Sequence, residues 1–355
     1  MTDRLAAPRP PGLRVKRIYR PALAGLLVLL ALIPLIASPY HTWIAASMLL
    51  LALFATGFNV LFGYTGLLSF GHAAFFGVGA YVSALVLLAW PSLPVAMVAG
   101  TLAAGAVGVV IGYLSLRHTD IYFAMLTLAF GMMIHSIIWR WRDVTGGDDG
   151  LPGVPRGVLG VPGAGLDLAD LDRFYYVVLV VTVVAVYGLW RVVRSPLGLT
   201  FQGVRDNETR VAYAGIHVRR VRLASFVLSA LTAGLAGSLW APLNTNAGPG
   251  VAHWTFSAEP VLASLLGGAH VFGGPAVGAF LLFFAKQIVV QYTQYWLLVL
   301  GMIVVVLVLA FRGGVASAAL TLLSRVTADD DTRPSDDQRK AADALGTTSR
   351  GSGDG

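Results

Sequence analysis

Residues 21–37 read PALAGLLVLLALIPLIA and contain no charged side chain. Two further uncharged runs, 225–240 and 296–311, have a similar length. Each approaches the roughly 20 apolar residues that an α-helix needs to cross a hydrocarbon core of about 30 Å. The whole chain agrees, because 56% of its 355 residues are hydrophobic and only 12% are charged, well below the charged fraction of soluble domains. The sequence therefore predicts an all-α fold, a polytopic transmembrane helix bundle.

Candidate spans follow one another along the chain with short connectors between them. The eighth is short and ends at Gly267 and Gly268, so a broken or re-entrant segment is the alternative there. The first follows a basic segment as a signal peptide would, but its apolar run is longer than a usual signal core, and a retained helix is expected. About ten spans are expected, over 21–38, 43–62, 72–90, 94–116, 121–139, 174–190, 223–241, 257–272, 274–291 and 296–312.

Basic residues set the expected orientation. Residues 1–20 carry six Arg or Lys against one acid, which predicts a cytoplasmic N-terminus. Counting spans from there places the Arg-rich connector 191–222 inside, and the Gly- and Pro-rich loop 140–173 outside as an irregular loop. The transmembrane domain is expected over 21–315, and residues 316–355 are expected to be a disordered cytoplasmic tail. The net charge of +7 therefore indicates topology in a lipid bilayer rather than nucleic-acid binding.

Several kinds of chemistry are missing from the sequence. The chain has no cysteine, which excludes disulfides and thiol catalysis, and no HExxH-type metal motif. A phosphate-binding P-loop needs Gly directly before Lys, and none of Lys16, Lys286 and Lys340 follows a glycine. No cofactor or enzymatic activity is expected in this chain, so any ATP and Mg would be bound and used by a partner ATPase.

Two ionisable residues fall inside the expected spans. Glu259 opens the eighth span and Lys286 lies within the ninth, where a charge costs about 3 kcal/mol or more. Glu259 is interpreted either as a solvated helix end or as a residue of a transport path. Lys286 is able to snorkel to the interface, and a structural salt bridge between the two is a further interpretation.

Small residues at GxxxG spacing indicate where helices approach closely. One pair is Gly108 and Gly112, and another is Gly274 and Gly278. Packing inside one bundle is the favoured interpretation, and a face for a second subunit is the alternative.

Residues 63–72 read GYTGLLSFGH and interrupt two apolar runs with glycines and hydroxyls. One interpretation is a tight cytoplasmic turn between spans. The other, which we favour, is an unwound stretch whose main chain lines a transport path. His72 taken alone is more often a packed or capping residue than a ligand.

Residues 203–215 read GVRDNETRVAYAG and carry the signals of a short helix. Asp206 or Asn207 is suited to cap its start, Glu208 is favourable near its positive end, and Gly215 is suited to end it. The helix is interpreted either as a surface helix at the lipid headgroups or as a docking helix for a groove on a soluble partner, which we favour.

Three blocks of the sequence resemble one known family. They are GYTGLLSFGHAAFFGVGAY at 63–81, the connector and following helix at 203–237, and the run 259–279, which includes LLGGAHVFGGPAVGA. In this order and spacing they resemble the LivM-type permease subunits of branched-chain amino acid ABC importers, over about 40–315. Asp206 departs from the pattern, because the family more often has Glu there, and the change is conservative.

This resemblance implies an assembly. It would contain a second related permease, two cytoplasmic ATPases and an external solute-binding protein, in the plasma (inner) membrane of a prokaryote, with both termini of this chain cytoplasmic. By the same resemblance, the cytoplasmic connector would dock on an ATPase. The expected coupling residues are Arg205, Asp206, Asn207, Glu208, Arg210 and Gly215. The expected path residues are Gly66, Ser69, Gly71 and His72, together with the intramembrane Glu259.

The expected cargo is a branched-chain amino acid, Leu, Ile or Val, and urea or a short amide is the alternative. A self-contained secondary transporter should show functional charges buried in mid-span, and this chain has few. A membrane-embedded enzyme should show a clustered acid–base or metal set, which the sequence lacks.

Overall fold

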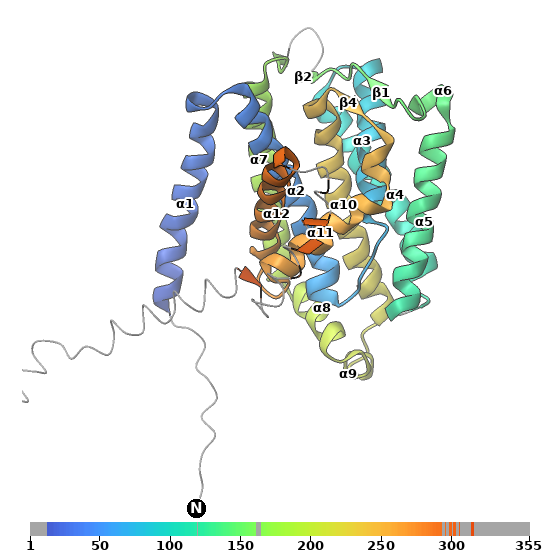
Figure 1. The fold of residues 1–355 in the computed structure, drawn as a ribbon. Coiled ribbons are helices and arrows are strands. Elements are labelled where there is room, and N and C mark those ends of the chain that lie inside the picture. Colours follow the sequence, from blue (N-terminus) through green and yellow to red (C-terminus); the bar gives the residue numbers. More distant parts are fainter. Residues whose placement is uncertain are drawn as a thin grey trace, which may run out of the picture.

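The computed structural model describes residues 13–118, 120–160, 165–292, 295, 298–299, 301–302, 305 and 314–315. Figure 1 shows long helices running side by side between two ends of a bundle. The main helices are α1 (Leu13–Ile36), α2 (Pro39–Asn59), α3 (His72–Ala89), α4 (Leu93–Ser115), α5 (Asp120–Arg140), α7 (Leu171–Val193), α10 (Val218–Asn244), α11 (Trp254–Gly267) and α12 (Gly274–Tyr292).

Seven helices of the described part are long and apolar enough to cross a membrane. They are Pro39–Tyr64, His72–Ala89, Leu93–Ser115, Asp120–Arg140, Leu171–Val193, Val218–Asn244 and Gly274–Tyr292. The first of these joins α2 to the π-helix η1 (Val60–Tyr64). A multi-pass, all-α membrane protein is therefore confirmed.

The other three expected spans have different outcomes. α1 has an apolar part, Gly25–Ile36, that is shorter than a span. α11 has 14 residues, a length of about 21 Å, which is too short for a hydrocarbon core. The last expected span, 296–312, lies almost entirely outside the described residues, as does the expected tail 316–355. The number ten stays a prediction.

Helix α10 packs against α2, α3 and α4 through glycines. A Cβ built on Gly237 would lie 2.0 Å from the carbonyl oxygen of Phe76, and one on Gly79 would lie 2.2 Å from that of Gly234. The main chains of α3 and α10 are thus in direct contact. Within lipid the hydrophobic effect does not drive helices together, so they associate through close packing of this kind.

The two GxxxG pairs also contact helices of this same chain. A Cβ on Gly108 of α4 would lie 2.5 Å from Ala230 of α10. A Cβ on Gly278 of α12 would lie 1.9 Å from the carbonyl oxygen of Ala263 on α11. Packing inside one bundle, the favoured interpretation, is confirmed at these positions.

Loop 140–173 and connector 191–222 lie at opposite ends of the bundle, the loop at the top of Figure 1 and the connector at the bottom. The loop is more ordered than the sequence predicts. It contains α6 (Arg142–Thr145), β1 (Leu151–Pro152), β2 (Val158–Leu159) and β3 (Leu166–Asp167). β2 pairs antiparallel with β3, and β1 pairs with β4 (Asn246–Ala247), the extension of α10.

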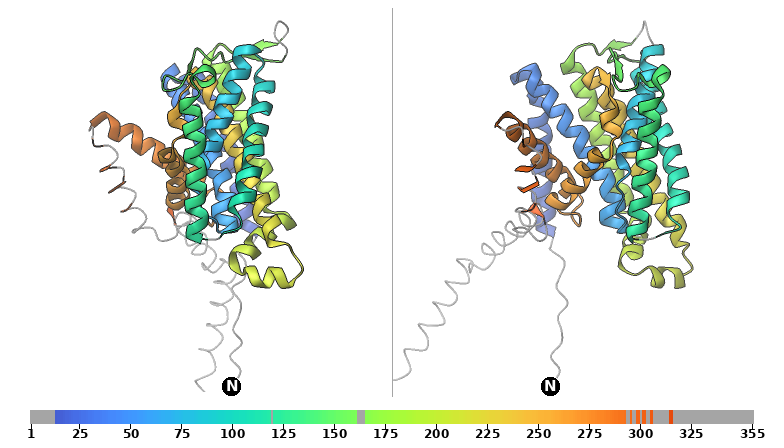
Figure 2. Two further views of the ribbon diagram at one scale, coloured as in Figure 1. Left: turned by 90° about the vertical axis from the view of Figure 1, so that its right-hand side faces the viewer. Right: turned by 45° about the vertical axis from the view of Figure 1, so that its right-hand side comes forward.

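The connector also differs from the expectation of one short helix, because it forms two helices, α8 (Pro196–Asp206) and α9 (Glu208–Tyr213). The remaining elements are the 3₁₀-helix η2 (Pro249–Ala252), which precedes α11, and the α11–α12 hairpin. Figure 2 shows this hairpin at one side of the bundle, where α11 contacts α2, α3 and α5.

Candidate functional site

The chain leaves the helix after η1 and does not resume it until His72. Within the segment, the Thr65 hydroxyl donates to the carbonyl oxygen of Val60 at 3.1 Å, and the Leu67 N–H donates to that of Leu61 at 3.2 Å. Gly66 has a φ of +79°, which turns the chain. Leu67 and Ser69 are buried. Residues 65–71 therefore form an unwound segment inside the bundle rather than a tight turn.

His72 joins this segment to α10. Its side chain is fully buried, with Nδ1 2.9 Å from the Ser69 hydroxyl and Nε2 2.8 Å from the Ser229 hydroxyl. A neutral imidazole donates through one nitrogen and accepts through the other, so the two hydroxyls satisfy both. Ser229 is eleven residues into α10, or about 16 Å along that helix, so the cluster lies deep in the bundle.

Aromatic rings complete the surroundings of His72. Phe58, Phe75 and Phe226 contact the imidazole edge to face, with ring centroids 5.0, 5.4 and 5.7 Å away. The structure therefore places His72 as a packed residue with satisfied hydrogen bonds, the interpretation that a lone histidine favours.

The start of α3 is also tied to α5 and α11. The Phe70 N–H donates to the Thr127 hydroxyl of α5 at 3.3 Å, and a Cβ on Gly71 would lie 2.2 Å from the Thr127 carbonyl oxygen. The Ala73 N–H, one of the free donors of the first helical turn, donates to the Ser257 hydroxyl of α11 at 2.8 Å. We refer to Ser69, His72, Ser229, Thr127 and Ser257 as the hydroxyl cluster.

Of the expected path residues, Ser69 and His72 belong to this cluster and Gly71 adjoins it against Thr127, whereas Gly66 lies apart, against Arg205 of α8. Sequence reasoning missed Thr127, Ser229 and Ser257. Each is one of several hydroxyl residues in a largely apolar helix, and nothing in the local pattern indicates which of them has a distant partner.

α8 packs on the underside of the bundle. Its buried face, Gly198, Phe201 and Val204, follows a helical spacing, and Phe201 belongs to a cluster with Val60 and Tyr64 of the η1 segment. The connector is thus attached directly to the helix that leads into the unwound segment.

α9 projects from the bundle with no buried residue. The Asn207 side chain accepts from the Arg210 N–H at 2.9 Å, which caps the helix, and Gly215 beyond its end has a φ of +81°. An ion pair of 2.5 Å joins Glu208 to Arg222 of α10. Tyr213 is 89% exposed. The cap and the end of this helix agree with the sequence signals.

Glu259 lies in the middle of α11 rather than at its opening, which corrects the expected position. Its carboxylate accepts from Lys286 Nζ of α12 at 2.7 Å, and the two side chains are 19% and 36% exposed. The geometry is therefore that of a salt bridge between α11 and α12, and a solvated helix end is not its environment.

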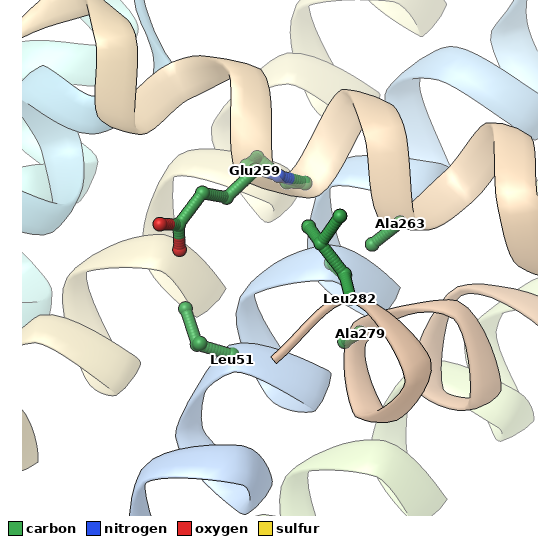
Figure 3. Close-up of a pocket in the computed structure, with 7 residues that line it drawn as sticks. Leu51, Glu259, Ala263, Ala279 and Leu282 are labelled. Atoms are coloured by element: carbon green, nitrogen blue, oxygen red, sulfur yellow. The ribbon is translucent and has the colours of Figure 1, made fainter. Parts of the chain in front are cut away.

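A small cavity lies beside Glu259. Its volume is about 10 Å³, room for about one water molecule, and it is lined by the apolar side chains of α2, α11 and α12. Figure 3 shows the Glu259 carboxylate at one side, with Leu51, Ala279 and Leu282 around the space. A cavity of this size has no room for an amino acid.

Among the described residues, no group of three or more His, Cys, Asp or Glu is arranged to hold a metal ion. What the geometry provides is a multi-pass helical membrane protein with an unwound, polar segment at its centre and an exposed helix at one end. Such a design is typical of transport proteins, in which irregular backbone at membrane depth is tolerated where it is enclosed by protein.

Comparison with known proteins identifies the family. The model described as branched-chain amino acid transport system / permease component matches residues 41–309, and the chain belongs to this family. It is similar to the high-affinity branched-chain amino acid transport system permease protein LivM of Escherichia coli K12, with 29% identity over 81% of this chain and 72% of the relative.

More distant relatives carry the name LivH. One is the high-affinity permease LivH of Salmonella typhimurium, 24% identical over 69% of this chain and 83% of its own length. Another is the probable permease LivH of Methanocaldococcus jannaschii, 23% identical over 68% of this chain and 78% of its own length. No solved structure matches significantly. The relatives are transport permeases rather than enzymes, and this chain is a permease of the ABC-importer kind.

Proposed function

We propose that this chain forms, together with a second related permease, the membrane path of an ATP-driven importer for branched-chain amino acids. The observation that carries the proposal is the exposed helix α9, which is attached through α8 to the helix that leads into the unwound segment. The chain belongs to a family of permeases, and its sequence has no P-loop. The chain thus offers a place for an ATPase to act while having no means to hydrolyse ATP.

The surface of α9 supports docking on a cytoplasmic ATPase. Glu208, Arg210 and Tyr213 are all exposed, and Tyr213 is a large amphipathic side chain of the kind enriched at the centre of protein interfaces. Asn207 caps the start of the helix and Gly215 ends it, so both are proposed to hold α9 in the shape that docks. A preformed short helix loses little conformational entropy on docking.

The names of the relatives support the other partners and the cargo. Permeases called LivM and LivH both occur in Escherichia coli K12, which supports a heteromer of two related permeases. Their names refer to branched-chain amino acids, so Leu, Ile and Val are the proposed cargo, delivered by an external binding protein. Urea or a short amide is the alternative cargo.

Orientation follows from charge. The Arg-rich connector 191–222 is proposed to face the cytoplasm of a prokaryotic inner membrane, together with both termini, and the loop 140–173 at the opposite end to face outward. With this orientation the hydroxyl cluster, which includes Ser69 and His72, lies between the two faces together with the adjoining Gly71, where a path would pass.

The test is reconstitution of the chain with its candidate ATPase, second permease and binding protein in proteoliposomes. We expect uptake of Leu that depends on ATP. Arg210→Glu and Gly215→Pro should leave membrane insertion intact and abolish ATPase binding or coupled uptake, whereas Arg191→Glu, an exposed charge reversal at the end of α7, should not. Uptake without ATP or without an ATPase, or normal uptake in both α9 variants, would contradict the proposal.

A further inference from the structure

Arg205, at the last turn of α8, reaches into the bundle. Its Nη1 donates to the carbonyl oxygen of Gly63 at 2.5 Å. Its Nε and Nη2 donate to Asp206 Oδ1 at 3.2 and 3.1 Å, which fixes the plane of the guanidinium. Only 29% of the Arg205 side chain is exposed, so its charge faces the helix end of the bundle and not a docking surface.

The acceptor of this bond is a helix-terminal carbonyl. The last carbonyls of any helix lack partners within it, and here those of residues 60–62 accept from residues 65–67 of the same segment. The Gly63 carbonyl is satisfied from another element, by Arg205. A cation at this position also faces the negative end of the helix dipole, so Arg205 acts as the cap of the helix Pro39–Tyr64.

The contact extends along the stem of Arg205. A Cβ on Gly66 would lie 2.9 Å from Arg205 Cγ, so the side chain is packed on the residue that turns the chain into the unwound segment. Phe201, one helical turn before Arg205, is buried against Val60 and Tyr64. α8 therefore holds the end of η1 in two ways, through the apolar contact of Phe201 and through the charged hydrogen bond of Arg205 to Gly63.

The same point touches the α11–α12 hairpin. Asn59 Nδ2 donates to the Ala269 carbonyl oxygen in the hairpin turn at 3.0 Å, and a Cβ on Gly63 would lie 2.3 Å from that same oxygen. Movement of Gly63 would therefore displace both the unwound segment and the hairpin that contains the Glu259–Lys286 salt bridge.

We infer that Arg205 is a positioning residue that transmits displacement of the α8–α9 connector to the unwound segment 65–71, through the Gly63 carbonyl. The far end of this segment is held by His72 and Ser229 to α10 and by Gly71 to α5. A push on α8 consequently changes the shape of residues 65–71 rather than moving the whole bundle. The inference deepens the proposed function and rests on it.

The experiment uses the complete reconstituted importer with three variants, Arg205→Gln, Arg205→Lys and Arg191→Gln. Leu uptake, ATP hydrolysis, ATPase binding and amide hydrogen exchange of residues 64–71 are measured for each. We expect Arg205→Gln to bind the ATPase and hydrolyse ATP as the unchanged protein does, with uptake per ATP lower by about tenfold. Exchange at residues 65–67 should rise by about tenfold.

The other two variants define the interpretation. Lysine keeps the positive charge and a donor for the Gly63 carbonyl, but it lacks the planar guanidinium that Asp206 holds in place. Arg205→Lys should therefore recover part of the coupling. Arg191→Gln removes the same charge from an exposed position and should match the unchanged protein. Equal losses of hydrolysis and uptake in Arg205→Gln, normal uptake per ATP, or unchanged exchange at residues 65–67 would overturn the inference.

Asp206→Asn covers the case in which Arg205→Gln fails to insert. Asp206 is 67% exposed, so its substitution should not unfold the chain, and freeing the guanidinium should lower uptake per ATP by a smaller factor. Normal coupling in this variant would again overturn the inference. By contrast, absence of ATP-dependent uptake in the unchanged importer would overturn the proposed function itself, which separates the two failures.

Discussion

Gly237→Ala tests the idea that direct main-chain contact between α3 and α10 holds the centre of the bundle together. The added Cβ would lie 2.0 Å from the carbonyl oxygen of Phe76, and an ordinary contact needs at least 3.4 Å, so the helices would have to separate by about 1.4 Å. A main-chain carbonyl cannot rotate away as a flexible side chain can. We therefore expect a loss near the upper end of the overpacking range, about 3 kcal/mol.

The assay is thermal unfolding of the purified chain in nanodiscs, followed by tryptophan fluorescence. A loss of this size corresponds to a fall in Tm of about 4 °C for a chain this long. Gly188→Ala is the matched control, because Gly188 of α7 is exposed and a Cβ there meets nothing within 4 Å, and it should be neutral or stabilising by up to about 1 kcal/mol. If the two variants melt within about 1 °C of each other, close backbone packing is not what stabilises this interface.

Three further predictions use the same melting assay or a binding assay. Glu259→Gln deprives Lys286 of its carboxylate and should cost about 3 kcal/mol, most of which a second change, Lys286→Met, should restore; additive losses would argue that the two charges do not interact. His72→Ala should cost about 3 kcal/mol and Ser229→Ala about 1 kcal/mol, since the latter leaves one imidazole hydrogen bond in place, and equal losses would contradict the cluster geometry. Tyr213→Ala should change stability by less than about 0.5 kcal/mol yet weaken ATPase binding by about tenfold or more, and unchanged binding would remove α9 from the interface.

The spans are the part of the fold that the sequence predicts best, because lipid imposes a length and a polarity that can be counted along the chain. Their number is harder to predict. The hydropathy of 257–272 resembles that of a span, yet α11 stops at Gly267, where a Cβ would lie 1.7 Å from the Gly274 carbonyl oxygen of the neighbouring helix. That close approach depends on tertiary packing, which the local sequence does not contain.

The connector gives a mixed outcome for a similar reason. The start of α9 at Asn207 and its end near Gly215 were predictable, since capping residues act on their own helix. α8 was not predicted, although Pro196 at the helix start and an apolar spacing that places Phe201 and Val204 on one face are both signals of a helix. The local sequence thus contains the apolar face of α8, but it does not show that this face packs on Val60 and Tyr64.

The hydrogen-bond partners of the unwound segment could not be predicted from the local sequence. Its glycines and hydroxyls predict a break in the helix, but main chain at membrane depth is stable only if every polar group finds a partner within the protein. Within the segment, the Phe70 N–H finds its partner at Thr127 of α5. The residues that flank the segment, Gly63, His72 and Ala73, find theirs on three further helices, up to 184 residues away in the chain, at Arg205, Ser229 and Ser257. The same requirement gives the segment its mechanical importance. Thr65, Leu67 and Ser69 are buried, so water does not readily replace a hydrogen bond that is broken beside them. Displacement of a neighbouring helix must therefore either move the segment or break such a bond, and this is the condition under which a push from α8 reaches the centre of the bundle.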